Sequence, residues 1–378
     1  MGDENEFVQR LLVRVLEDVH RRQPGVAGGW GAMQPLSGRR RAADALIAAA
    51  ARVGFSRRWY DPAEAAAALA DALERAAGLA RTETLLADQG SRDLLVALMS
   101  FRALGPRHTA LPVAERRFRR ECERVDAEMR VEDDVVREAH GHSLHRYAIP
   151  GREGPVALLG VAYLIHEIFE AEQYALTRGG VSVQAEPGDV ILDGGGCWGE
   201  TALYFAEAVG PQGRVLCCEF VPENLDILNR NLALNPSLAK RIEVVPHPLW
   251  DRSGETLDYS RDGGMSSLVH LGDDIRSQTL TASVDKLLAQ PGPDRIDLLK
   301  LDVEGAELRA LRGAEQTIRR HVPKLAISVY HRDSDLVEIP AWVADLDLGY
   351  ELYLDHLWPG MQETILFAKP RRRPARLD

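Results

Sequence analysis

Short apolar runs alternate with segments of helical spacing from about residue 188 onwards, and this alternation constrains the fold more than any other feature. The runs are DVILD, RVLCCEF, RIEVV, IDLLKLDV and KLAISVY. Strands that alternate with helices predict a parallel sheet covered on both faces. Two further runs, YELYLDH and ETILFA, flank a turn with Pro359 and Gly360 and predict a closing antiparallel pair. We therefore expect an α/β doubly wound domain.

The first part of the chain has a different pattern, in which alanine and leucine recur every three or four residues. It predicts an α-helical auxiliary domain over residues 1–135, a connecting region over 136–180, the α/β domain over 181–370 and a basic tail over 371–378. Asp61, Pro62 and Glu64 have the spacing of a helix start, and that helix should run towards Gly78. In the connecting region HRYAI and PVALLGV predict a hairpin around PGREG, and LIHEIFEAEQYAL predicts a helix.

Charge and composition narrow the classes of partner. The formal net charge of −11 disfavours nucleic acid, because a polyanion would be repelled over most of the surface. The basic runs at 39–41, 116–120 and 371–373 are interpreted as solvated faces or a tail. The longest apolar run, 155–165, is too short to cross a bilayer, no signal-peptide pattern is present, and the four cysteines form no CxxC pair. We expect a cytoplasmic protein with no membrane partner.

A glycine-rich turn, GGGCWG, follows the first strand of the predicted sheet. Gly194, Gly196 and Gly199 satisfy GxGxxG, which is a weak signal alone because such turns are common. Asp193 directly before the turn favours a positively charged ligand over a pyrophosphate. Glu219 lies twenty positions after Gly199, where a carboxylate can accept the hydroxyls of an adenosine ribose. The alternative without a ligand is that Asp193 caps the helix and Glu219 is a surface charge.

Charged residues also gather at the predicted carboxyl end of the sheet. Lys300, Asp302 and Glu304 alternate along IDLLKLDVEGAEL, and His331 and His356 end two later strands. Charges on a central strand are costly unless they are paired or reach a cleft, so we expect a cleft here. The alternative is structural: Lys300 neutralises Asp302, Glu304 caps the next helix, and each histidine serves the core.

These segments, in this order, resemble the FkbM family of S-adenosylmethionine-dependent methyltransferases over residues 170–368. The resemblance rests on DVILDGGGCWGETALYFA, RVLCCEFVPENLDILNRNLALN, IDLLKLDVEGAELRALRGAE, PKLAISVYHRDSDLVEIP and ETILFA. It implies a class I methyltransferase fold, Rossmann-like with a seven-stranded sheet, and O-methylation of a sugar or natural-product hydroxyl. It also implies a set of cofactor-binding residues: Tyr174, Asp193, Gly194, Gly195, Gly196, Trp198, Gly199, Thr201, Glu219, Phe220, Asn224, Trp250 and Asp251.

Methyl transfer requires alignment of the acceptor oxygen with the sulfonium methyl group and removal of the hydroxyl proton. We expect His331 or His356 to be the base, with Asp302 and Glu304 orienting a small-molecule acceptor and Lys300 holding those carboxylates. A divalent metal such as Mg²⁺, held by Asp302, a neighbouring carboxylate and a histidine, is the less favoured alternative. Two rival functions are a nicotinamide-dependent oxidoreductase and a non-catalytic cofactor-binding scaffold. The helical region is a candidate lid or homo-oligomer interface.

Overall fold

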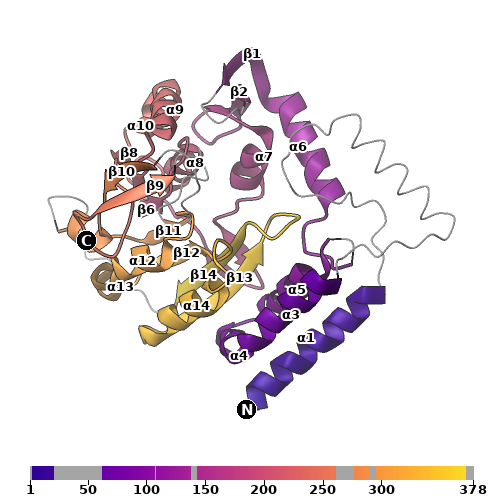
Figure 1. Ribbon diagram of the computed structural model, residues 1–378. Coiled ribbons are helices and arrows are strands. Elements are labelled where there is room, and N and C mark those ends of the chain that lie inside the picture. Colours follow the sequence, from indigo (N-terminus) through magenta and orange to yellow (C-terminus); the bar gives the residue numbers. More distant parts are fainter. Residues whose placement is uncertain are drawn as a thin grey trace. The chain divides into compact units, whose positions relative to one another are not determined.

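A computed structural model describes residues 2–20, 62–106, 108–137, 143–260, 276–289 and 295–371 of the chain (Figure 1). Its contacts divide the chain into two compact units, Met1–Arg119 with Trp358–Gln362, and Arg120–Leu357 with Glu363–Asp378. The division falls within helix α6 (Glu115–Met129), earlier than the boundary expected near residue 135. The loop at 24–31, the basic run at 39–41 and most of the tail lie outside the described residues.

The first unit is helical where it is described. Its helices are α1 (Gly2–His20), α3 (Pro62–Glu74), α4 (Ala76–Leu85) and α5 (Gln89–Leu104). Helix α1 packs against α4 and α5, and its Phe7 and Leu11 are fully buried. The predicted start at Pro62 is confirmed, but α3 ends at Glu74 and Gly78 lies inside the next helix.

The second unit is built on a seven-stranded sheet of order β13-β14-β12-β11-β6-β7-β8. Strands β6 to β8, β11 and β12 are parallel, and β14 is antiparallel to β13, as the sequence predicted. Strand β14 is also antiparallel to β12. The strands are β6 (Val190–Gly194), β7 (Arg214–Cys218), β8 (Ile242–Val245), β11 (Leu298–Leu301), β12 (Lys324–Ser328), β13 (Tyr350–His356) and β14 (Thr364–Pro370).

Helices that connect these strands are α8 (Glu200–Val209), α9 (Pro222–Leu234), α10 (Pro236–Ala239), α11 (Val284–Leu287), α12 (Glu307–Arg312), α13 (Glu315–His321) and α14 (Asp335–Asp345). Helix α10 packs against α8 and α9, whereas α14 packs against α12 and β13. Every residue of β6, β11 and β12 is buried, which explains their nearly continuous apolar sequences. The exceptions within them, Asp193, Lys300 and Lys324, therefore need buried partners.

A smaller antiparallel sheet precedes the large one. The predicted hairpin is confirmed as β2 (Ser143–Ile149) and β3 (Val156–Gly160). The expectation that residues up to 135 are purely helical was wrong, because β1 (Arg130–Arg137) pairs with β2. Its valines give no clean alternation, since Val131 and Val135 are 53% and 42% exposed. Two short pairs were not predicted: β4 (Leu176–Arg178) with β5 (Val181–Val183), and β9 (Thr256–Ser260) with β10 (Arg276–Leu280).

The helix predicted over LIHEIFEAEQYAL is only partly confirmed. Helix α7 (Ala162–Ile165) continues as a π-helical turn, η1 (His166–Glu170). The chain then leaves the helix, and Glu172 has a φ of 51°. Tyr174 therefore lies in a turn beyond the helix rather than on its surface.

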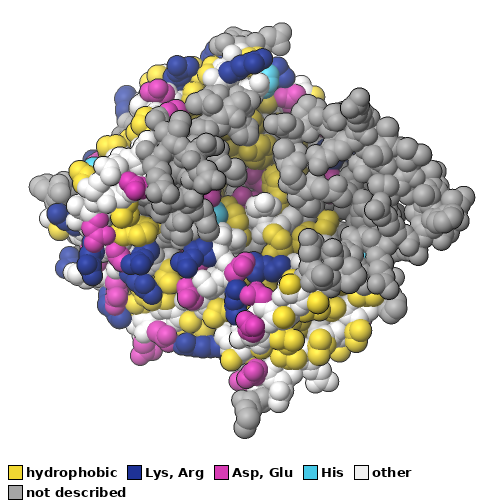
Figure 2. Space-filling view, in the orientation of Figure 1, with side chains coloured by type: hydrophobic (Ala, Val, Ile, Leu, Met, Phe, Trp, Pro, Cys, Tyr) yellow, Lys and Arg dark blue, Asp and Glu magenta, His cyan; other side chains and the backbone are white. Residues whose placement is uncertain are grey.

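The surface agrees with the reading of residues 116–120 as a solvated helix face. The arginines of this run on α6 are exposed, while Phe118 is buried. On the face shown in Figure 2, lysine and arginine lie among aspartate and glutamate over the part of the surface that is described. Within the described ranges, no helix is both long enough and apolar enough to cross a bilayer.

Candidate active site

The glycine turn lies at the carboxyl end of β6, between this strand and α8. Gly195 has a φ of 82°, and a Cβ there would lie 1.8 Å from the carbonyl oxygen of Asp302. A Cβ at Gly196 would lie 2.2 Å from the sulfur of Cys217. The amides of both glycines donate to the carbonyl of Cys218 at 3.0 Å. Only glycine fits these two positions, because the turn is pressed against the ends of both neighbouring strands.

Asp193 is buried and paired inside the protein, which corrects one argument from the sequence. It is fully buried, its Oδ1 lies 2.9 Å from Lys300 Nζ, and its Oδ2 accepts a hydrogen bond from Thr201 at 2.7 Å. Its charge is therefore neutralised inside the protein and gives no preference for a cationic ligand. Asp193 and Thr201 instead fasten the start of α8 to the end of β6.

Lys300 also has a different role from the one predicted. Its ammonium group pairs with Asp193 and donates to the carbonyl oxygens of Gly194 at 3.1 Å and Gly195 at 2.6 Å. Burial alone would lower the pKa of Lys300, but Asp193 and Asp302 outweigh it and raise the pKa. Lys300 therefore holds the glycine turn, and the prediction that it holds Asp302 and Glu304 was wrong.

Trp198 and Gly199 complete the turn. The Trp198 side chain is 4% exposed and packs with Leu144 and Ile227. Gly199 has a φ of 88° and begins α8. The backbone carbonyl of Trp198 accepts from Asn231 Nδ2 at 2.8 Å. The indole is thus part of a small core with the hairpin, and its assignment to the cofactor stays a prediction.

Glu219 follows β7 and lies one strand away from the turn. Its Oε1 accepts from the amides of Phe220 at 2.6 Å and Val221 at 2.7 Å, and its Oε2 accepts from Asn224 Nδ2 at 3.3 Å. Burial raises the pKa of this carboxyl group, while the amide hydrogen bonds oppose the rise. A carboxylate oxygen has two lone pairs, so Oε2 can still accept a ribose hydroxyl. The Phe220 ring packs edge-on against Tyr259, with ring centres 4.9 Å apart.

Trp250 and Asp251, the residues expected at the adenine end, lie in the loop after β8. Arg309 on α12 stacks over the Trp250 ring at 5.3 Å, and its Nη1 lies 2.6 Å from Asp251 Oδ2. Gly313 packs tightly beneath, since a Cβ there would lie 2.0 Å from the Trp250 carbonyl oxygen. These contacts fix the loop, and the assignment to adenine remains a prediction.

An acidic cluster around His331 adjoins the glycine turn. His331 Nδ1 lies 2.9 Å from Glu307 Oε1, and its Nε2 lies 3.5 Å from Asp302 Oδ1 and 3.4 Å from Glu304 Oε2. The structure thus brings together three of the predicted catalytic residues. Strand β11, however, ends at Leu301, and Glu304 has a φ of 52°, so Glu304 reaches the cluster from a turn and not from the strand face.

The cluster makes His331 a poor base. Burial alone would lower the pKa of the imidazole, but Glu307, Glu304 and Asp302 outweigh it and raise the pKa well above its usual value. In this arrangement His331 already carries its second proton near neutral pH and cannot accept another. The same imidazole holds the pKa of the Asp302 carboxyl group low against the effect of burial, so Asp302 is ionised.

His356 is not part of this cluster. It is fully buried in β13, and its Nδ1 lies 2.8 Å from the hydroxyl of Thr364, its cross-strand partner on β14. Strand β14 separates β13 from β12, the strand that leads to His331. The expectation that both histidines face one cleft was therefore wrong, and the structural reading of His356 fits better.

Two carboxylates of the cluster, Glu363 and Glu167, were not predicted from the sequence, and Tyr174 was predicted only as a cofactor contact. Tyr174 donates to Asp302 Oδ2 at 2.7 Å, and Tyr330 donates to Glu363 Oε1 at 3.1 Å. Burial, followed by repulsion from Asp302, raises the pKa of Glu363 to about 8. Glu167 on η1 is also buried, and Glu363 and Asp302 help to raise its pKa well above its usual value. Glu363 was detectable in principle, since an antiparallel last strand begins at the edge where its parallel neighbours end.

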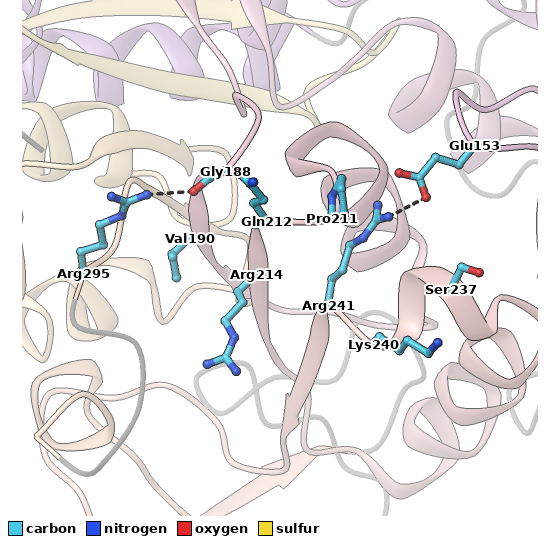
Figure 3. A pocket seen from close by; sticks show the side chains of 11 residues that line it. Glu153, Gly188, Val190, Pro211, Gln212, Arg214, Ser237, Lys240, Arg241 and Arg295 are labelled. Carbon is cyan, nitrogen blue, oxygen red and sulfur yellow. Dashed lines mark hydrogen bonds and ion pairs between the residues drawn. The ribbon is translucent and has the colours of Figure 1, made fainter. Parts of the chain in front are cut away.

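A separate pocket of about 750 Å³ opens at the opposite edge of the sheet, where β6 and β7 begin (Figure 3). Arg295 donates there to the Gly188 carbonyl at 2.8 Å, and Arg241 pairs with Glu153. None of the residues predicted for the active site lines it. Ligands of such sheets bind at the carboxyl edge, so the glycine turn and the acidic cluster remain the candidate active site.

Residues 182–352 match the model of the methyltransferase FkbM domain. The second unit therefore contains a segment that is similar to the FkbM methyltransferase domain. Its sheet order and the helical first unit confirm the predicted class I methyltransferase fold with an N-terminal α-helical region.

Known relatives agree with this assignment. Methyltransferase sdnD of Sordaria araneosa is 27% identical in a 216-residue alignment that covers 47% of this chain and 80% of sdnD. AMB antimetabolite synthetase AmbE of Pseudomonas aeruginosa is 27% identical over 206 residues, but only 10% of AmbE is covered. The crystal structure of methyltransferase FkbM from Methylobacillus flagellatus KT matches 88% of this chain and 72% of its own, with a TM-score of 0.53 and 19% identity. The last likeness concerns the fold alone.

Proposed function

We propose that this chain transfers the methyl group of S-adenosylmethionine to a hydroxyl oxygen of a small-molecule acceptor, of the sugar or natural-product class. The observation that carries the proposal is the direct contact between two sites. The Asp302 amide donates to the Gly194 carbonyl at 3.0 Å, so the glycine turn and the acidic cluster share one backbone ladder. The similarity to sdnD supports methyl transfer, and the similarity to a segment of an antimetabolite synthetase supports a small-molecule acceptor.

The residues present fit the cofactor. Gly195 and Gly196 leave a cradle that a Cβ would fill, and Glu219 keeps an acceptor site on Oε2 for a ribose hydroxyl. When bound, S-adenosylmethionine supplies an electrophilic methyl group on a sulfonium. The carboxylates of the cluster would face both the sulfonium charge and the acceptor. Their negative charge would favour a close approach of the acceptor oxygen to the methyl group.

The acceptor proton goes to a carboxylate in this proposal, in place of the histidine that the sequence suggested. Asp302 is ionised, accepts from Tyr174, and is only 18% exposed. Tyr174 therefore fixes Oδ2 of Asp302. Oδ1 accepts a long hydrogen bond from Tyr330 at 3.4 Å and lies 3.5 Å from His331 Nε2, and its second lone pair can orient and deprotonate the hydroxyl. His331 keeps Asp302 ionised.

Calorimetric titration with S-adenosylhomocysteine and with NAD⁺ tests the cofactor. We expect saturable binding of S-adenosylhomocysteine, lost in Gly195→Ala and weakened in Glu219→Gln, and no binding of NAD⁺. Binding of NAD⁺ alone would establish the oxidoreductase alternative. Labelled S-adenosylmethionine with a panel of hydroxylated acceptors tests the reaction, and cofactor binding without transfer to any acceptor would support the scaffold alternative.

A further inference from the structure

Glu200, the first residue of α8, is a buried carboxyl group at the glycine turn that was not among the predicted cofactor residues. It is 5% exposed, and its Oε2 accepts no hydrogen bond from any residue that the structure describes. The two other buried carboxylates beside the turn have partners. Asp193 pairs with Lys300 and accepts from Thr201. Glu219 accepts from two backbone amides, so within the described ranges Glu200 alone of these three keeps a buried oxygen without a donor.

The glycine turn also has more negative than positive charge around it. The three ammonium protons of Lys300 meet Asp193 and two carbonyl oxygens of the turn, so none is left for Glu200. A buried carboxylate without a partner is costly. Burial accordingly raises the pKa of Glu200 to about 7; Lys300 opposes the rise, and Asp193 and Glu219 add to it. The folded chain is therefore short of one positive charge at Glu200.

The place of Glu200 in the fold matches one end of the proposed cofactor. Strand β6 lies between β7, which leads to the candidate ribose ligand Glu219, and β11, which leads to the candidate base Asp302. The sulfur of S-adenosylmethionine carries the ribose, the methyl group and the amino-acid end. If the first two lie towards β7 and β11, we expect the amino-acid end at the carboxyl end of β6, where the glycine turn leads directly into Glu200.

We propose that the Glu200 carboxylate binds the α-ammonium group of S-adenosylmethionine, and that it selects ligands with an amino-acid end. The inference rests on the proposed function, because it takes that cofactor as the ligand. An ammonium group supplies both a hydrogen-bond donor for Oε2 and the missing positive charge. A neutral hydroxyl would supply only the donor. Glu200 is then ionised whenever the cofactor is bound.

Calorimetric titration of the full chain with S-adenosylhomocysteine and with 5′-methylthioadenosine, which lacks the amino-acid end, tests the contact. Glu200→Gln should weaken binding of S-adenosylhomocysteine by about tenfold or more and leave binding of 5′-methylthioadenosine within about twofold. Glu338→Gln is the matched control, because Glu338 is an exposed carboxylate on α14 that accepts from Ser334, and it should bind both ligands like the unchanged chain.

The other outcomes of this titration separate the two proposals. An equal loss for both ligands would mean that Glu200 only supports the turn, and an unchanged affinity for S-adenosylhomocysteine would mean that it makes no contact. Either result overturns this inference and leaves the proposed cofactor intact. If the unchanged chain binds neither ligand, the proposed cofactor is wrong and the inference is wrong with it.

A second measurement follows the proton of Glu200. At pH 7 about half of the chains hold this proton, and an ammonium group that binds the carboxylate displaces it. Calorimetry in two buffers of different ionisation enthalpy should therefore show that S-adenosylhomocysteine releases up to about 0.5 proton more from the unchanged chain than from Glu200→Gln. Equal proton release overturns the inference. The other titratable groups around Glu200 are present in both proteins: Asp193, Glu219, Lys300, Cys197 and Tyr163.

Discussion

Replacement of Lys300 by methionine tests the reassignment of this lysine from the acidic cluster to the glycine turn. Its ammonium group has three protons and meets three oxygens, on Asp193, Gly194 and Gly195. Methionine has a similar shape but no charge, so Lys300→Met leaves Asp193 buried with only the Thr201 hydroxyl as a partner. Removal of one member of a buried ion pair costs about 3–5 kcal/mol. The free energy of unfolding should fall by about this amount.

The pairing itself is tested by a second substitution in the same chain. Asp193→Asn removes the negative charge that Lys300→Met leaves unpaired. The variant with both substitutions should therefore recover most of the lost free energy of unfolding, with a coupling energy of about 2 kcal/mol or more. Asp302→Asn is the matched control, because the sequence alone suggested that Lys300 pairs with Asp302. Urea denaturation followed by circular dichroism provides the assay, and the Lys300→Met midpoint should shift by about 1–2 M. Rescue by Asp302→Asn instead of Asp193→Asn would refute the reassignment.

Three further predictions concern the turn and its supports. Gly195→Ala should lower the affinity for S-adenosylhomocysteine at least 100-fold by calorimetry. Gly210 is the control, because it also has a positive φ of 67° but a Cβ there would meet nothing within 4 Å, so Gly210→Ala should leave the affinity unchanged. Equal affinities of the two variants would contradict the role of Gly195 in cofactor binding. Burial raises the pKa of Glu200 to about 7 from 4.5, so the native chain loses stability as pH rises between these values. The free energy of unfolding of Glu200→Gln, measured in urea, should therefore equal that of the native chain at pH 4.5. At pH 8 it should be higher by about 3 kcal/mol at most. A difference that does not change with pH excludes the titration of Glu200 as its cause. Asn231→Ala removes three buried hydrogen bonds to the backbone of β3 and the glycine turn, and should cost about 2–3 kcal/mol in the same assay; a loss below 0.5 kcal/mol contradicts the bracing role.

The sheet was predictable because its strands are nearly continuous apolar runs. Each of the seven runs became a strand, and the glycine turn and Glu219 lie at the ends of β6 and β7 as expected. Strand β1 was missed because its apolar residues, Val131, Val135 and Val136, do not alternate with polar residues in the sequence. A strand is recognised from sequence mainly by such alternation.

The cluster around His331 was only half predictable. Asp302, Glu304 and His331 follow strands and could be placed by strand ends alone. Glu167 reaches the cluster from a π-helical turn, and no pattern in the sequence marks that irregularity. The protonation of His331 could not be foreseen either, because it depends on three carboxylates that meet only in the folded chain.

The misassignment of Lys300 shows which information was missing. Along a strand, residues 300 and 302 are on the same side, and this alternation suggested that Lys300 and Asp302 act together. In the sheet, β11 lies beside β6 in a register that places Lys300 directly opposite Asp193. Opposite charges on paired residues of a buried parallel sheet must neutralise each other, because no solvent reaches either one. Once the strand order places β11 beside β6, charge pairing alone selects Asp193, and Asp302 is left to the cluster around His331.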